Sequence, residues 1–289
     1  MKTLLCSKLL TGFLLALSLS FIAGCSLVHQ RPENSKSLAL SELKLPFLSK
    51  GIPVLPVDEI LLLDDSMRNW VQEKIRGARS PQSRMRNLVS GLLAEGLFNL
   101  EYNGNETYTA RETFHRRQGN CLSFSLLFVA LAREAGLDAK FQLVDVPLSF
   151  SSADSLIFLN NHINVVVRKV KDDYRFVRNH VVDFNTAVYE GEYTFREVTD
   201  KNAFALFYSN LSVEMLRANE YANSYMAIRR SIELKDDIPG PWVNLGVLLS
   251  RIEEPKFALA AYHQALNVNP STKSAMVNLA RLNNQLGNK

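Results

Sequence analysis

The central part of the chain reads ARETFHRRQGNCLSFSLLFVALAREAGLDA over residues 110–139. A capping-box pattern stands at the beginning of this stretch. Thr109 lies three residues before Glu112, and each side chain can accept a hydrogen bond from a free backbone N–H group at a helix start. The sequence therefore predicts a short helix from about residue 110. That helix is interrupted by QGN at residues 118–120, where the glycine and asparagine favour a turn.

The apolar run after this break predicts a buried helix. From Cys121 to about Ala135 apolar residues recur at helical spacing, and Gly136 follows as a common helix terminator. Cys121 is therefore expected at the first position of a helix. There the helix dipole and the unpaired backbone N–H groups favour a negative charge, so the position suits a reactive thiolate.

On either side of this helix the pattern predicts further regular structure. Strands are expected over Ala139–Val146, Ile163–Val170 and Tyr174–Phe184, with a turn at residues 171–173 that makes the last two a hairpin. Helices are expected over Ile60–Ile75 and from the Ser80-Pro81 cap to Gly96. Helices, then strands, then helices again indicate an α+β fold, with helices packed on an antiparallel sheet.

Residues 203–289 are predicted to be helical throughout. Small and aromatic residues there resemble one tetratricopeptide repeat of about 34 residues, and they are Trp242, Leu245, Gly246, Ala258, Tyr262, Ala265 and Pro270. Leu249 departs from the repeat pattern, which favours tyrosine. The pattern recurs in degenerate form one period earlier and ends one period later in a capping helix. Because about three repeats are normally needed to fold alone, we expect this segment to rest on the preceding domain.

The composition excludes several classes of protein. The chain has 289 residues, of which 47% are hydrophobic, so it is too apolar for intrinsic disorder and long enough for about two domains. Its net charge is only +4, and its basic residues are not concentrated in one segment, so no nucleic-acid partner is expected. No paired His or Cys spacing indicates a metal site, and no glycine-rich loop indicates a nucleotide site. We therefore expect no cofactor.

The N-terminus has the features of an export signal. Lys2 and Lys8 precede an apolar run, and the sequence IAGC ending at Cys25 resembles the bacterial lipoprotein box. The resemblance implies that residues 1–24 are removed and that Cys25 is acylated, which anchors the protein through a tether over residues 25–57. Ser26 replaces the aspartate of the inner-membrane retention signal, so the outer membrane facing the periplasm is expected. The alternative is a membrane-spanning helix.

Only one of the three cysteines then remains as a free thiol. Cys6 leaves with the signal and Cys25 is modified, so Cys121 is alone in an oxidising compartment. A lone exposed thiol there is prone to oxidation. Cys121 is therefore either buried as a small apolar residue or used in chemistry.

The order of elements around Cys121 resembles the transglutaminase-like (papain-like cysteine) superfamily. In that family a Gly-x-Cys begins the central helix, a histidine begins a later strand and an aspartate lies on the next one. The matching positions are Cys121, His162 in NNHINVVV, and Asp183 in VVDF. The resemblance covers about residues 60–195 and implies a domain over residues 58–200, followed by the repeats.

This resemblance implies a role for each matched residue. Cys121 would be the nucleophile, His162 would exchange protons, and Asp183 would orient the imidazole. The backbone N–H of Cys121 is a candidate donor to an oxyanion, and Gln118 is a possible second donor.

Each assignment has an alternative. Cys121 could be structural, beneath the apolar helix. His180 competes with His162 but stands three residues before Asp183, so on one strand these two side chains would point to opposite faces. Asp145 and Asp154 are the other candidate orienting residues.

Two functions follow. The first is a periplasmic thiol enzyme that acts on amide bonds of peptides or proteins, with the acyl group passed to water or to an amine. The second is a non-catalytic lipoprotein that uses the same fold and its helical repeats as a binding platform for a protein partner.

Overall fold

The computed structural model describes most of the chain after residue 49. The described residues are 50–96, 101–102, 106–153, 156–168, 179–184 and 194–287, with backbone alone for 101–102, 145–153 and 156–161. The expected signal, Cys25 and most of the tether lie outside this part. Within it, no helix has both the length and the apolar character that crossing a membrane requires.

Two helices precede the central one. A 3-10 turn, η3 (Val57–Glu59), is followed by α1 (Asp65–Ile75) and α2 (Pro81–Ala94). The prediction that a helix begins at Ile60 is wrong, because the Asp64 side chain accepts from the backbone N–H of Met67 and fixes the helix start there. The Ser80-Pro81 cap of α2 is confirmed.

The central stretch folds as its sequence predicts. The helix α3 (Ala110–Arg116) has the capping box of Thr109 and Glu112, and it ends at Arg117 in the left-handed region with φ 56°. A two-residue strand, β2 (Gln118–Gly119), pairs in parallel with β1 (Glu101–Tyr102). The helix α4 (Cys121–Glu134) follows, so Cys121 is its first residue.

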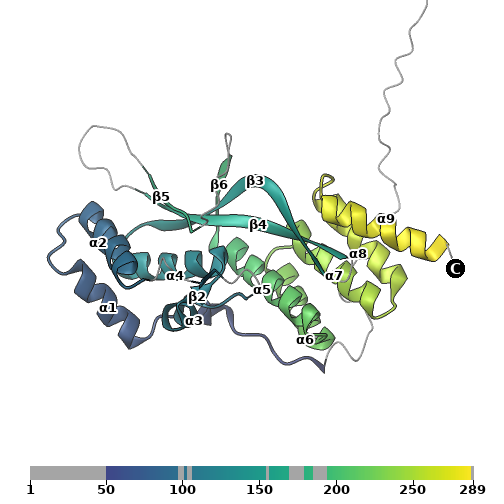
Figure 1. Cartoon of the computed structure of the whole chain (residues 1–289), viewed down its shortest axis with the longest axis horizontal. Helices are drawn as coiled ribbons and strands as arrows, with labels where there is room; N and C mark the ends of the chain where they lie inside the picture. The colour runs from purple at the N-terminus through teal and green to yellow at the C-terminus, as the bar shows by residue number, and fades with distance from the viewer. Residues whose placement is uncertain are drawn as a thin grey trace, which may run out of the picture. The chain divides into compact units, whose positions relative to one another are not determined.

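The main sheet has four antiparallel strands in the order β5-β4-β3-β6, and α4 lies along it (Figure 1). They are β3 (Ala139–Ala153), β4 (Leu156–Val167), β5 (His180–Val182) and β6 (Phe195–Val198). The first two are longer than predicted, since a hairpin continues through a serine-rich stretch after a shift in register between Val144 and Ser149. His162 therefore lies within β4 rather than at its beginning. Residues 169–178 of the expected hairpin lie outside the description.

All elements after the sheet are helical. They are α5 (Asp200–Arg217), α6 (Tyr221–Leu234), α7 (Pro239–Arg251), α8 (Pro255–Val268) and α9 (Lys273–Gly287). The starts of α6 and α8, and those of α7 and α9, are each 34 residues apart, which is consistent with helical repeats. Gly246 permits the close approach of α7 and α8, because a Cβ atom there would lie 2.4 Å from the Tyr262 ring.

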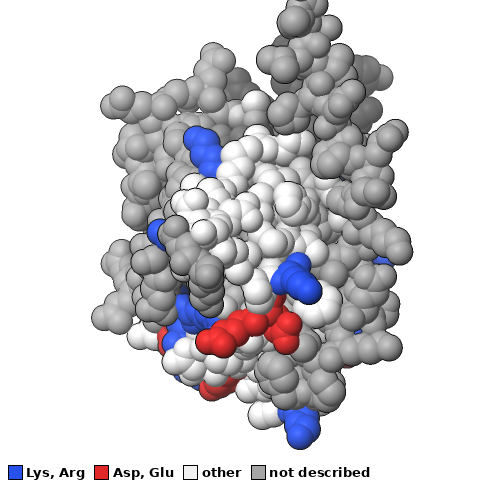
Figure 2. Space-filling model, turned by 90° about the vertical axis from the view of Figure 1, so that its right-hand side faces the viewer, with Lys and Arg blue, Asp and Glu red and all other residues white. Residues whose placement is uncertain are grey.

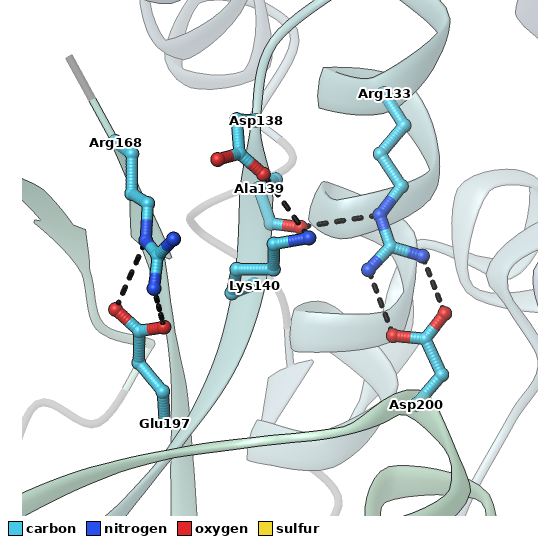
Figure 3. Close-up of polar contacts among 7 residues, drawn as sticks. All are labelled: Arg133, Asp138, Ala139, Lys140, Arg168, Glu197 and Asp200. Carbon is cyan, nitrogen blue, oxygen red and sulfur yellow. Dashed lines mark hydrogen bonds and ion pairs between the residues drawn. The ribbon is translucent and has the colours of Figure 1, made fainter. Parts of the chain in front are cut away.

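Helix α5 belongs to both hydrophobic cores. Its residues Phe207 and Tyr208 are buried with α4 and the sheet, whereas Leu216 is buried with the later helices. At the far end of α4, Arg133 binds both carboxylate oxygens of Asp200 at 2.6 and 2.8 Å, and its Nε donates to the carbonyl of Ala139 (Figure 3). The first helix after the sheet is thus part of the same packed structure as α4.

Candidate active site

The thiol of Cys121 lies at the N-terminus of α4. Asn120 caps this helix, because its Oδ1 accepts from the backbone N–H of Ser123 at 3.0 Å. The Cys121 side chain is half-buried. Within the described part of the chain, its backbone N–H is bonded to no acceptor. The helix start therefore offers a partly accessible thiol beside an N–H group that can donate a hydrogen bond to a negatively charged atom.

His162 joins this thiol to a carboxylate. The His162 side chain is only 5% exposed, and its Nε2 lies 2.9 Å from both oxygens of Asp183, the first residue after β5. A hydrogen bond also joins the His162 side chain to the Cys121 side chain. The strand β4 and the end of β5 thus bring together two residues that are 21 positions apart.

The surroundings of His162 favour its charged form. Burial alone lowers the pKa of His162, but hydrogen bonds to Asp183 and to the Cys121 side chain outweigh it and raise the pKa to about 9. The imidazole is therefore protonated at neutral pH while it contacts a thiol. This arrangement allows a thiolate–imidazolium pair.

The comparison with protein families agrees with this geometry. The model of the transglutaminase-like superfamily matches residues 68–178, which include Cys121 and His162. The chain carries a transglutaminase-like domain. The match stops before Asp183 and does not reach the C-terminal helices, which are consistent with repeats. Among curated proteins, none matches the chain.

The structure places the other candidate residues only in part. His180 is exposed on β5. The Asp145 side chain and all of Asp154 lie outside the described residues. Gln118 is half-buried in β2, three residues before Cys121, and its backbone pairs with that of Glu101. Its role as an oxyanion donor stays a prediction.

One residue that the sequence patterns did not indicate also contacts Asp183. Asn164 is fully buried on β4, and its Nδ2 donates to Asp183 Oδ2 at 3.0 Å. It follows His162 by two residues, so the alternation of a strand could have indicated it. Asp183 is thus held by both His162 and Asn164. Among the described residues, no three His, Cys, Asp or Glu side chains gather as metal ligands would.

Proposed function

We propose that this protein is a lipid-anchored thiol enzyme of the bacterial cell envelope that acts on amide bonds of peptides or proteins. Cys121 is the nucleophile, His162 the acid and base, and Asp183 the residue that orients His162. The single observation that carries the proposal is the position of His162, which contacts both Asp183 and the thiol at the start of α4. The transglutaminase-like match supports the same chemistry.

The reaction proceeds in two steps. The Cys121 thiolate attacks the amide carbonyl carbon, and the developing oxyanion is stabilised by the N–H groups at the start of α4. Protonated His162 gives its proton to the amide nitrogen, so that the C–N bond breaks, an amine leaves and a thioester remains. Water or a second amine then attacks the thioester and gives a proton to His162, and the C–S bond breaks to restore the thiolate.

Trapping of the thioester tests this proposal. The full chain is incubated with envelope extract and quenched in acid, and the peptide containing Cys121 is analysed by mass spectrometry. We expect an acyl adduct on Cys121 in the wild type and none in Cys121→Ala or His162→Ala. The matched control is His180→Ala, which removes an exposed histidine and should keep the adduct. An unmodified Cys121 in both the wild type and His180→Ala would contradict the proposal.

The location is a separate part of the proposal. It is supported by the IAGC sequence that ends at Cys25 behind an apolar run. We expect Cys25→Ala to block processing and leave the longer precursor. A Cys25→Ala protein that is still cut and still sediments with membranes would contradict lipid anchoring. Separation of the inner and outer membranes of cells that make the wild-type protein tests the expected outer-membrane attachment.

A binding platform is the second candidate function. The last helix, α9, exposes Met276, Val277 and Leu286 at 45%, 41% and 39%. Figure 2 shows that the side of the molecule toward the C-terminal helices has a broad central area without charged residues. The exposed apolar side chains of α9 favour contact with a protein partner. If Cys121 proves no more reactive than a free thiol, this function takes precedence over the enzyme.

A further inference from the structure

Helix α5 contacts the region around α4 near both ends of that helix. At the C-terminal end, Asp200 pairs with Arg133. Near the N-terminal end, Glu214 on α5 accepts hydrogen bonds from the side chain and the backbone N–H of Thr107. Thr107 in turn contacts Asn120, the residue that caps α4 in front of Cys121. A chain of contacts therefore leads from the C-terminal helices to the candidate nucleophile.

The hydrogen bonds in this series of contacts all run in one direction, from Asn120 through Thr107 to Glu214. Asn120 uses its Oδ1 to accept from Ser123, so its Nδ2 is free to donate, and it donates to Thr107 Oγ1 at 2.7 Å. A threonine hydroxyl has one proton. Because it accepts from Asn120, it gives that proton to Glu214. Thr107 and Asn120 are only 4% and 6% exposed, so water does not readily replace these bonds.

Glu214 changes its charge close to neutral pH. Burial raises the pKa of Glu214, the bonds from Thr107 lower it, and the net value is about 7. The charged groups around it are Glu106, which raises this pKa, and Arg217, which lowers it. Tyr108 also faces this group, with the Arg116 guanidinium 4.9 Å from its ring centre. Proton uptake by Glu214 turns one of its carboxylate oxygens into an O–H group and removes the negative charge, so the hydrogen bonds from Thr107 become weaker.

We propose that Glu214 is a positioning residue for Cys121, and that its carboxylate holds the cap of α4 in place through Thr107 and Asn120. Through this contact the C-terminal helices set the reactivity of the thiol. This inference deepens the proposed function and rests on it, since it assigns a regulator to the same site. It also gives a functional reason for a half-buried carboxylate whose ionised form is disfavoured by partial burial.

The rate at which iodoacetamide alkylates Cys121 tests the inference without any substrate. The full chain is alkylated across the pH range around 7, and the Cys121 peptide is quantified by mass spectrometry, which separates it from Cys6 and Cys25. We expect the wild-type rate to rise as Glu214 ionises, in addition to any inflection that belongs to the thiol itself. Glu214→Gln should lose the rise near pH 7 and react about fivefold more slowly above it, the equivalent of one lost hydrogen bond.

Two further sets of variants separate positioning from a general effect. Glu106→Gln removes a neighbouring carboxylate that is exposed, and it should keep the rise near pH 7. Thr107→Val should behave like Glu214→Gln, whereas Thr107→Ser retains the hydroxyl and should behave like the wild type. Glu214→Gln should also unfold at no lower temperature than the wild type above pH 7, because it removes a buried charge.

Several outcomes would overturn the inference. A wild type without the rise, a Glu214→Gln protein that keeps it, or a Glu106→Gln protein that loses it would each do so. These outcomes differ from failure of the proposed function, in which Cys121 reacts no faster than a free thiol and forms no acyl adduct. If Cys121 is reactive but its alkylation rate has the same pH dependence in Glu214→Gln as in the wild type, the proposed enzyme function stands and the role of Glu214 as a positioning residue is contradicted.

Discussion

His162 is almost fully buried and yet favours its proton, because Asp183 and Cys121 compensate for the burial. Removal of Asp183 leaves only Cys121 to oppose the effect of burial, and therefore lowers the pKa of His162. We expect Asp183→Ala to slow turnover about 10²- to 10⁴-fold, which is less than the loss for Cys121→Ala. The limb of the rate–pH profile that reports His162 should also move to lower pH. A profile unchanged in shape would show that Asp183 does not act through His162.

The same interaction makes stability depend on pH. The pKa of His162 is raised from 6.5 to about 9 in the folded state, so its stabilising effect is complete below pH 6.5 and is lost as the pH rises through 9. The difference in unfolding free energy between the wild type and Asp183→Asn should therefore shrink over this range. Urea denaturation at several pH values measures it, and a constant difference would argue against the interaction.

At the scale of residues, the sequence could identify the groups whose neighbours lie close along the chain or follow a known order. Cys121 is a candidate nucleophile because of its place at a helix start and because we expect the other two cysteines to be removed or modified. Asn164 could have been found by strand alternation. Glu214 could not, because its contact with Thr107 joins segments more than 100 residues apart and depends on how α5 packs.

At the scale of elements, the cap of α4 is the feature on which the site depends. Asn120→Ala removes the acceptor of the Ser123 N–H and the donor to Thr107, so we expect a loss of about 1 kcal/mol of stability. The alkylation rate of Cys121 should fall in parallel. Asn120→Asp is the matched control, since it keeps the acceptor but loses the donor. If both variants keep the wild-type rate, the cap does not position the thiol.

The approach of α7 to α8 gives a second prediction at this scale. A methyl group at Gly246 would lie inside the contact distance of the Tyr262 ring, which is fully buried. Gly246→Ala should therefore destabilise the protein by about 1–3 kcal/mol. Thermal unfolding measures the loss, and Gly240→Ala on the same helix is a control, because a Cβ atom there would meet only Ser209 Oγ at 3.8 Å.

Elements with strong local signals were predicted well, and those without them were not. The capping box of α3 and the limits of α2 and α4 follow from side chains adjacent to the helix ends. By contrast, β6 has only four residues, with three of them exposed, so no hydrophobic pattern indicates it. The serine-rich end of β3 forms a strand because β4 supplies its hydrogen-bond partners, and that pairing is not written in the local sequence.

At the scale of the molecule, the helices after the sheet depend on the domain before them. Phe207 and Tyr208 on α5 are buried against that domain, so residues 203–289 expressed alone would expose both rings. We expect this segment to be weakly folded, with a broad thermal transition by circular dichroism. A sharp transition at the temperature of the full-length protein would show an independent module instead.

Helix α5 also has a consequence for the order in which the protein acquires its structure during synthesis. Phe207 and Tyr208 are part of the same core as α4, and they are made after Cys121, His162 and Asp183. Until then the nascent chain lacks part of the packing that holds the nucleophile. We therefore expect the proposed site to form only once α5 has packed on the preceding domain, and a chain truncated before α5 to lack a reactive Cys121.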